Sequence, residues 1–73
     1  MTHPIDKAVK REQRICFGIA WFATEADADA YAAEVRKAGR TYNGGFFHGM
    51  PCGRDSGWDH TDGEGRRLYA VTD

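Results

Sequence analysis

The sequence predicts an α+β fold, a small βαββ domain in which one main helix packs on one face of a three-stranded sheet. Residues 15–23 (ICFGIAWFA) form a continuous apolar run of strand length, residues 25–38 are rich in alanine, and residues 66–72 (RRLYAVT) alternate like a strand. A chain of 73 residues has the size of one domain. We expect residues 1–14 to form an N-terminal arm or short helix and residues 15–72 to form the βαββ core.

The apolar run is the expected central strand, because runs without alternation are typical of strands covered on both faces. Thr24 follows as an N-cap for the helix, and acidic residues crowd its first turn, where they favour the positive end of the helix dipole. Arg36 and Lys37 lie at the other end, and Gly39 suits the left-handed conformation that ends many helices. The helix places one apolar stripe against the sheet: Ala28, Tyr31, Ala32, Val35 and Ala38.

Residues 40–50 (RTYNGGFFHGM) resemble the second strand of the sheet. Asn43-Gly44 is a hairpin signal, but the preceding arm is short, so a bulged single strand is an equally good interpretation. Pro51 ends this strand because it has no hydrogen-bond donor, and the polar, glycine-rich residues 52–65 form a loop. We expect a right-handed crossover through the helix and an antiparallel return of the last strand.

The last strand turns Leu68, Ala70 and Thr72 to one side and Tyr69 and Val71 to the other. A three-stranded sheet with one helix leaves a face open, which either the arm or a second copy of the chain must cover. A chain this small buries only about 60% of its unfolded surface. A homodimer is therefore expected.

The composition argues against membrane binding and against general attraction to nucleic acid. The net charge is −1, with 10 basic and 11 acidic side chains, so no overall field attracts polyanions. No apolar stretch is long enough for a membrane span, and the charged start lacks the apolar core of a signal peptide. We expect a cytoplasmic protein in which Cys16 and Cys52 are free thiols.

Metal-ligating residue types gather near the C-terminus, but their spacing fits no known kind of site. His48 and Cys52 are separated by three residues across a proline, without the second ligand pair of a structural zinc site. The acids are spaced unlike those of a calcium loop. The residues weighed are His48, Cys52, Asp55, Asp59, His60, Asp62 and Glu64. We expect no metal and no cofactor.

A metal- or thiol-dependent enzyme is a further alternative. Cys52 or Ser56 could act as a nucleophile with His48 or His60 as its base. Catalytic groups usually converge from distant segments onto a pocket, and a domain with one helix and three strands offers little concavity. We therefore expect no enzymatic activity and name no catalytic residues.

Residues 39–58 combine glycines with aromatic and arginine side chains, the residue types that concentrate binding energy at interfaces. We expect a face that binds a protein partner or a second copy, made of Tyr42, Phe46, Phe47, Arg54 and Trp58. Alternation along a strand would expose one of the two phenylalanines. Trp58 lies in a loop, so we expect its replacement by alanine to weaken association and leave the fold intact. The open alternative is that the aromatics only close the small core.

A nucleic-acid-associated factor is the alternative binding function. It depends on the one basic run of the chain, near its N-terminus, together with scattered arginines that could complete a phosphate-binding surface. These residues are Lys7, Lys10, Arg11, Arg14, Arg40, Arg54, Arg66 and Arg67.

The stretch YNGGFFHGMPCGRDSGWDHTDGEGRRLYAVTD, residues 42–73, is similar in texture to short uncharacterised proteins encoded in bacteriophage and prophage genomes. The resemblance covers roughly the C-terminal half of the chain. It implies a small phage or host-derived accessory protein, and it carries no known site residues.

Overall fold

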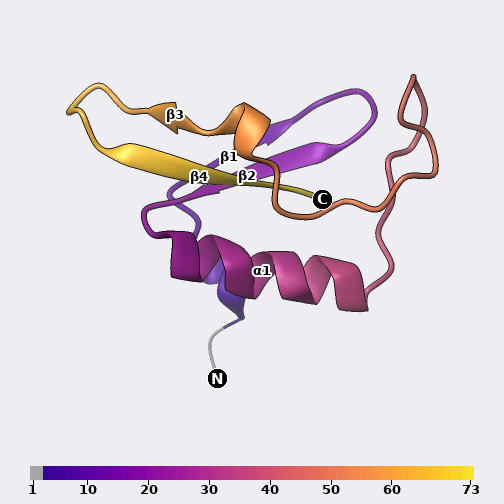
Figure 1. Ribbon diagram of the computed structural model, residues 1–73, viewed down its shortest axis with the longest axis horizontal. Coiled ribbons are helices and arrows are strands. Elements are labelled where there is room, and N and C mark those ends of the chain that lie inside the picture. Colours follow the sequence, from indigo (N-terminus) through magenta and orange to yellow (C-terminus); the bar gives the residue numbers. More distant parts are fainter. Residues whose placement is uncertain (1–2) are drawn as a thin grey trace.

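The computed structural model describes residues 3–73 as one α-helix on a four-stranded antiparallel sheet (Figure 1). The elements are η1 (Pro4–Lys7), β1 (Lys10–Gln13), β2 (Gly18–Phe22), α1 (Glu25–Lys37), η2 (Ser56–Trp58), β3 (His60–Thr61) and β4 (Arg67–Thr72), where η denotes a 3-10 helix. The strands lie in the order β1-β2-β4-β3, and each is antiparallel to its neighbours. The α+β class is confirmed, with four strands instead of three.

Helix α1 begins where the sequence predicts, and it ends one residue earlier. Thr24 Oγ1 accepts a hydrogen bond of 3.1 Å from Asp27 N, which satisfies one of the amides left unpaired at a helix start. The helix ends at Lys37, and Gly39 follows with a φ of +72°, which costs glycine little. Ala38, expected on the apolar stripe, is exposed at the C-cap. The buried residues of the helix are Ala28, Tyr31, Ala32 and Val35.

The sheet is covered on both faces by different parts of the chain (Figure 1). Helices α1 and η1 pack on one face, where Phe22 and Val71 are completely buried. Segment η2 packs on the other face, where Trp21 and Leu68 are buried and the Trp21 indole N–H donates to the Trp58 carbonyl at 2.9 Å. On the face that the sequence left open, Trp58 of η2 and Phe17 pack against the buried residues.

Strand β1 forms within the segment that the sequence assigned to an arm. All four of its residues are exposed and polar, so no apolar alternation marks it as a strand. It is an edge strand whose backbone pairs with β2, with Lys10 opposite Trp21 and Gln13 opposite Gly18. The charged side chains discourage a further strand from pairing at this edge.

The predicted second strand, residues 40–50, is a loop outside the sheet. Its two arms pair with each other, since Tyr42 N donates to Met50 O at 2.9 Å and Cys52 N donates to Arg40 O at 3.0 Å. Glycines with positive φ at 44, 45 and 49 turn the chain back between these arms. The expected right-handed crossover is therefore wrong, because β4 lies beside β2 and runs antiparallel to it. The predicted loop 52–65 also contains η2 and β3.

Candidate binding surface

The β1–β2 turn and the loop of residues 40–52 lie beside each other at one end of the molecule (Figure 1). A hydrogen bond of 2.8 Å from Asn43 N to Cys16 O joins the loop to the turn. Four side chains are exposed here: Ile15 (98%), Phe46 (96%), Phe47 (53%) and Met50 (53%). We call these four residues the apolar end.

Touching aromatic rings connect the apolar end to the core. This aromatic row consists of Phe46, Phe47, Tyr42, Phe17 and Trp58, whose consecutive ring centroids lie 5.2, 5.9, 4.9 and 6.0 Å apart. Aromatic pairs at such distances contribute about 0.5–1.5 kcal/mol beyond the area they bury. Tyr42 packs against the core on the α1 side of the sheet and Phe17 on the opposite side, so the row passes around the end of the sheet.

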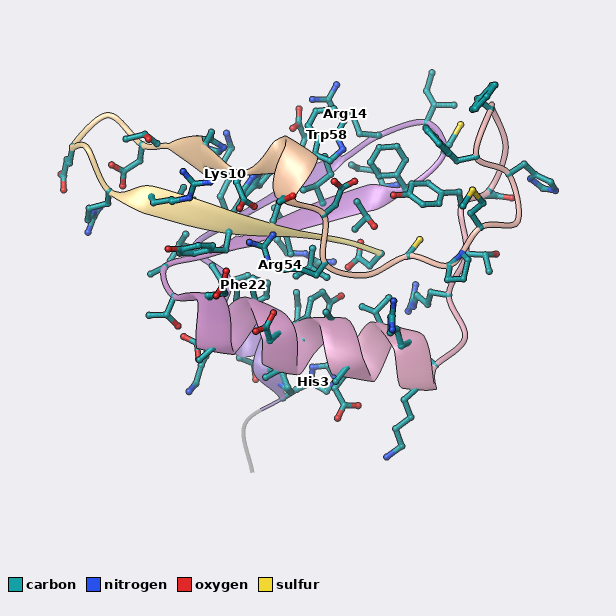
Figure 2. The ribbon with its side chains drawn as sticks, in the orientation of Figure 1. His3, Lys10, Arg14, Phe22, Arg54 and Trp58 are labelled. Carbon is teal, nitrogen blue, oxygen red and sulfur yellow. The ribbon has the colours of Figure 1, made fainter. Side chains whose placement is uncertain are left out.

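The structure brings four of the five predicted binding residues into this row, and it places them differently from the prediction. Phe46 and Phe47 are both exposed, because they lie in a turn and not in a strand. Trp58 is half-buried against Phe17, with the Arg14 guanidinium 4.8 Å from its ring (Figure 2). Sequence reasoning missed Phe17 because its place in the apolar run indicated a core residue.

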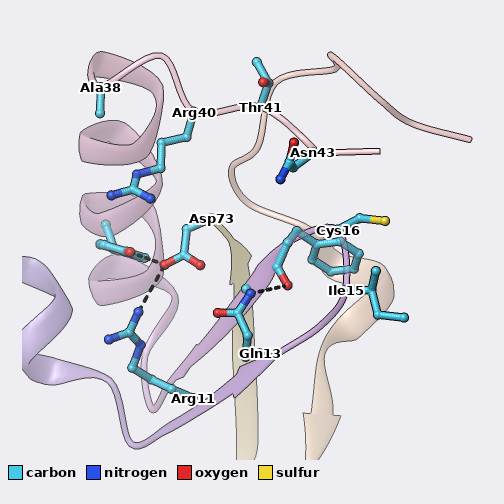
Figure 3. A pocket seen from close by; sticks show the side chains of 12 residues that line it. Arg11, Gln13, Ile15, Cys16, Ala38, Arg40, Thr41, Asn43 and Asp73 are labelled. Atoms are coloured by element: carbon cyan, nitrogen blue, oxygen red, sulfur yellow. Dashed lines mark hydrogen bonds and ion pairs between the residues drawn. The ribbon is translucent and has the colours of Figure 1, made fainter. Parts of the chain in front are cut away.

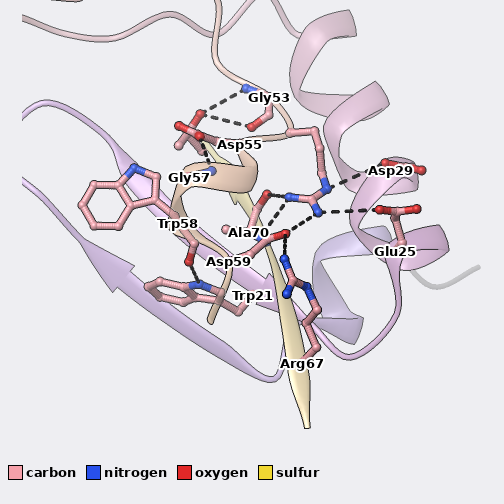
Figure 4. A network of polar contacts seen from close by, with 12 residues as sticks. Trp21, Glu25, Asp29, Gly53, Asp55, Gly57, Trp58, Asp59, Arg67 and Ala70 are labelled. Carbon is pink, nitrogen blue, oxygen red and sulfur yellow. Dashed lines mark hydrogen bonds and ion pairs between the residues drawn. The ribbon is translucent and has the colours of Figure 1, made fainter. Parts of the chain in front are cut away.

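Arg54, the fifth predicted residue, lies apart from the row and belongs to a polar network with Asp59 and Ala70, which Figure 4 shows at the edge of β4. Its two terminal nitrogens donate to the Asp59 carboxylate at 2.7 and 2.8 Å, and Nη1 also donates to Ala70 O at 2.8 Å. Glu25 and Asp29 of α1 lie 3.9 and 4.0 Å from the same guanidinium. These internal partners leave Arg54 little capacity to bind another molecule.

The same network satisfies the backbone of β4 beyond the two-residue strand β3. Asp59 Oδ1 accepts from Ala70 N at 2.7 Å, and Asp55 N donates to Ala70 O at 3.1 Å. The hydrogen bonds from Arg54 hold the pKa of Asp59 below its ordinary value, and the Asp59 carboxylate raises the pKa of Arg54. Asp59 therefore stays ionised and serves as a strand partner for β4.

A polar hollow of about 660 Å³ opens beside the apolar end (Figure 3). Its lining includes Ile15 of the apolar end, two arginines, Arg11 and Arg40, and the Asp73 carboxylate between them. Asp73 accepts a hydrogen bond from the Tyr31 hydroxyl and lies 3.6 Å from Arg11 Nη2. Burial of the side chain is the main cause that raises the pKa of Tyr31 to about 12, and this hydrogen bond is the second. We call this site the arginine hollow.

Several of the residues considered for metal or thiol chemistry make contacts within the fold. Within residues 3–73, no three His, Cys, Asp or Glu side chains are grouped so that they could hold a metal ion. The His60 ring lies 5.3 Å from that of Trp21, and the Asp55 side chain accepts from Gly57 N in η2 at 3.0 Å. Cys16 and Cys52 are free thiols, and burial raises the pKa of the Cys52 thiol, which disfavours the nucleophilic thiolate.

Comparisons of the chain with protein-family models, with curated proteins and with solved structures found no match. Among the described residues, no helix has the length and apolar character needed to cross a bilayer. The apolar end, the aromatic row and the arginine hollow are therefore the features from which a function can be inferred.

Proposed function

We propose that this chain is a non-enzymatic interaction module that binds another protein through its apolar end. The carrying observation is that four large apolar side chains, Ile15, Phe46, Phe47 and Met50, are exposed on two segments that the Asn43 N–Cys16 O hydrogen bond joins. Contiguous exposed apolar patches on small proteins mark interaction sites, whereas single exposed apolar residues are ordinary. The resemblance to phage-encoded proteins implies an accessory role, which such a module suits.

The aromatic row supports the Phe47 ring, and Phe46 contacts the other rings of the row through Phe47. Phe47 rests against Tyr42, whose hydroxyl lies 3.2 Å from Thr72 Oγ1 at the end of β4. Tyr42 in turn contacts Phe17, which packs against the core on the other face of the sheet. The Phe47 and Tyr42 side chains, held in this way, lose little conformational entropy on binding, which favours affinity.

The apolar end by itself supports a weak complex. Burying one large apolar side chain contributes about 1.5–3 kcal/mol, so four side chains contribute roughly 6–12 kcal/mol. Association costs about 4–15 kcal/mol in lost translational and rotational freedom. A tight complex would need polar contacts around the apolar end.

Nucleic-acid binding is supported less well. The exposed surface includes the aliphatic side chains of Ile15 and Met50, which offer no face for base stacking, and the rings of Phe46 and Phe47 meet at 83°. Most basic residues of that hypothesis also have acidic partners within the chain: Lys7, Arg11, Arg14, Arg54, Arg66 and Arg67.

The double substitution Phe46→Ser/Phe47→Ser tests the proposed function. We expect the wild-type chain to select short peptides from a random display library, and the double variant to bind them at least tenfold more weakly, a loss of about 1.4 kcal/mol. Phe46 is exposed and Phe47 packs on Tyr42, so the free energy of unfolding should fall by about 0.5–1.5 kcal/mol, the contribution of that aromatic pair, and the variant should stay folded. Peptide affinity is read by fluorescence anisotropy and stability by urea denaturation.

Val9→Ser is the matched control, because Val9 is exposed but lies before β1 and outside the apolar end. It should bind the selected peptides like the wild type. Equal binding by the double variant and the wild type would contradict the proposed function.

A further inference from the structure

Resting on that proposed function, we infer that the partner presents an acidic peptide segment that also carries apolar residues. A carboxylate of this segment enters the arginine hollow, while its apolar side chains cover the apolar end. Ile15 lines the hollow and belongs to the apolar end, so one short segment can reach both.

The two chain segments that form the apolar end, residues 14–17 and 40–52, contain no acidic residue. Residues 35–52 carry three basic residues and neither Asp nor Glu, and residues 13–24 carry one basic residue and no acid. The acidic first turn of α1 lies at the opposite end of the helix from the 40–52 loop (Figure 1). A partner that approaches the apolar end therefore meets a positively charged surface, which attracts acidic segments and repels basic ones.

Arg40 is the residue that supplies this charge inside the hollow. Among residues 3–73 no carboxylate lies within ion-pair distance of its guanidinium, whereas Arg11 in the same hollow is paired with Asp73. The Asp73 side chain is only 8% exposed, so its charge is largely covered. Arg40 is therefore the guanidinium of the hollow that stays available for a further carboxylate. Arg40 can donate charge-assisted hydrogen bonds to a partner carboxylate, which are stronger than those between neutral groups.

A second copy of the chain fits this end less well than an acidic partner. A two-fold contact through the apolar end would bring the same patch of both copies together, including Arg40 and Arg14. Like charges would then oppose each other in the interface. An acidic segment meets no such repulsion.

The test compares the peptides selected by the wild type with those selected by Arg40→Gln. We expect wild-type selection to enrich Asp or Glu together with Phe, Leu or Trp, and Arg40→Gln to lose the enrichment in acids. For one selected acidic peptide, Arg40→Gln should weaken binding about tenfold at low salt, and high salt should remove most of that difference. Lys37→Gln is the control, because Lys37 ends α1 and does not line the hollow.

Each remaining outcome overturns the inference in a recognisable way. Selected peptides that are apolar without acids, and that still depend on Phe46 and Phe47, overturn the inference and leave the proposed function standing. Equal effects of Arg40→Gln and Lys37→Gln overturn it as well. If an oligo-dT probe binds more tightly than any selected peptide, the surface binds nucleic acid. If sedimentation equilibrium shows a dimer that Phe46→Ser dissociates, the surface binds a second copy of the chain.

Discussion

Replacing Asp59 by asparagine is expected to destabilise the fold by about 3 kcal/mol at neutral pH, the lower end for removing one partner of a buried ion pair. The Asp59 side chain is only 3% exposed and holds both Arg54 and the backbone amide of Ala70. Asparagine retains one acceptor oxygen, but its amide group would face the Arg54 guanidinium. Urea denaturation at neutral pH measures the loss.

The effect of Asp59→Asn should depend on pH. The pKa of Asp59 is lowered in the folded protein, so its ionised form contributes stability above the ordinary Asp value of about 3.9. That contribution is lost as the pH falls through the lowered pKa. We therefore expect the difference between wild type and variant to be full at pH 7 and to shrink below about pH 4.

Asp55→Asn is the control for this substitution, because an asparagine oxygen can still accept the hydrogen bond from Gly57 N. It should leave stability within about 0.5 kcal/mol of the wild type. An Asp59→Asn variant as stable as Asp55→Asn at neutral pH would show that the network at the edge of β4 does not hold the fold together.

Trp58→Ala should destabilise the fold by about 2 kcal/mol, less than the 3–5 kcal/mol of a fully buried tryptophan, because the ring is half-buried. The ring covers Phe17 on the sheet face away from α1 and carries the Arg14 guanidinium. For a domain of this size, 2 kcal/mol corresponds to a fall of roughly 8–16 °C in the thermal midpoint.

Phe46→Ala is the matched comparison for Trp58→Ala. The Phe46 ring is exposed, so its removal should leave the midpoint within a few degrees of the wild type. A Trp58→Ala variant with an unchanged midpoint and weakened binding would instead support the purely interfacial role that the sequence suggests for Trp58.

The parts of the fold that the sequence predicts well are those set by local interactions. The Thr24 cap, the charges at each helix end and the glycine at residue 39 define α1 within one residue at its end. In the apolar runs that form β2 and β4, the order of the side chains likewise predicts which residues are buried. Leu68 and Ala70 do pack on the face opposite Val71, as the alternation predicts.

The parts predicted wrongly depend on partners that are distant in the sequence. Strand β1 is polar and exposed at all four residues, so only its pairing with β2 makes it a strand. Residues 40–50 have strand-like composition, but their glycines adopt positive φ and turn the chain away from the sheet. Without that strand, β4 takes the place beside β2.

Distance along the sequence also explains which of the predicted binding residues lie together in the structure. Tyr42, Phe46 and Phe47 come from one short segment, so the sequence places them together correctly. The sequence does not indicate that Arg54 forms ion pairs with Glu25 and Asp29, because these two partners lie on a helix far away in the chain. Phe17 could have been found only from the contact between the β1–β2 turn and the 40–52 loop.

The most direct test of the central claim, that partners bind at the apolar end, is a map of backbone amide shifts in the ¹⁵N-labelled chain titrated with a selected peptide. We expect the shifts to concentrate in residues 14–17 and 40–50, with a smaller shift at Trp58, which contacts Phe17. Shifts centred instead on Val9, Lys10 and Tyr69, which line a separate groove at β1 and β4, would contradict it.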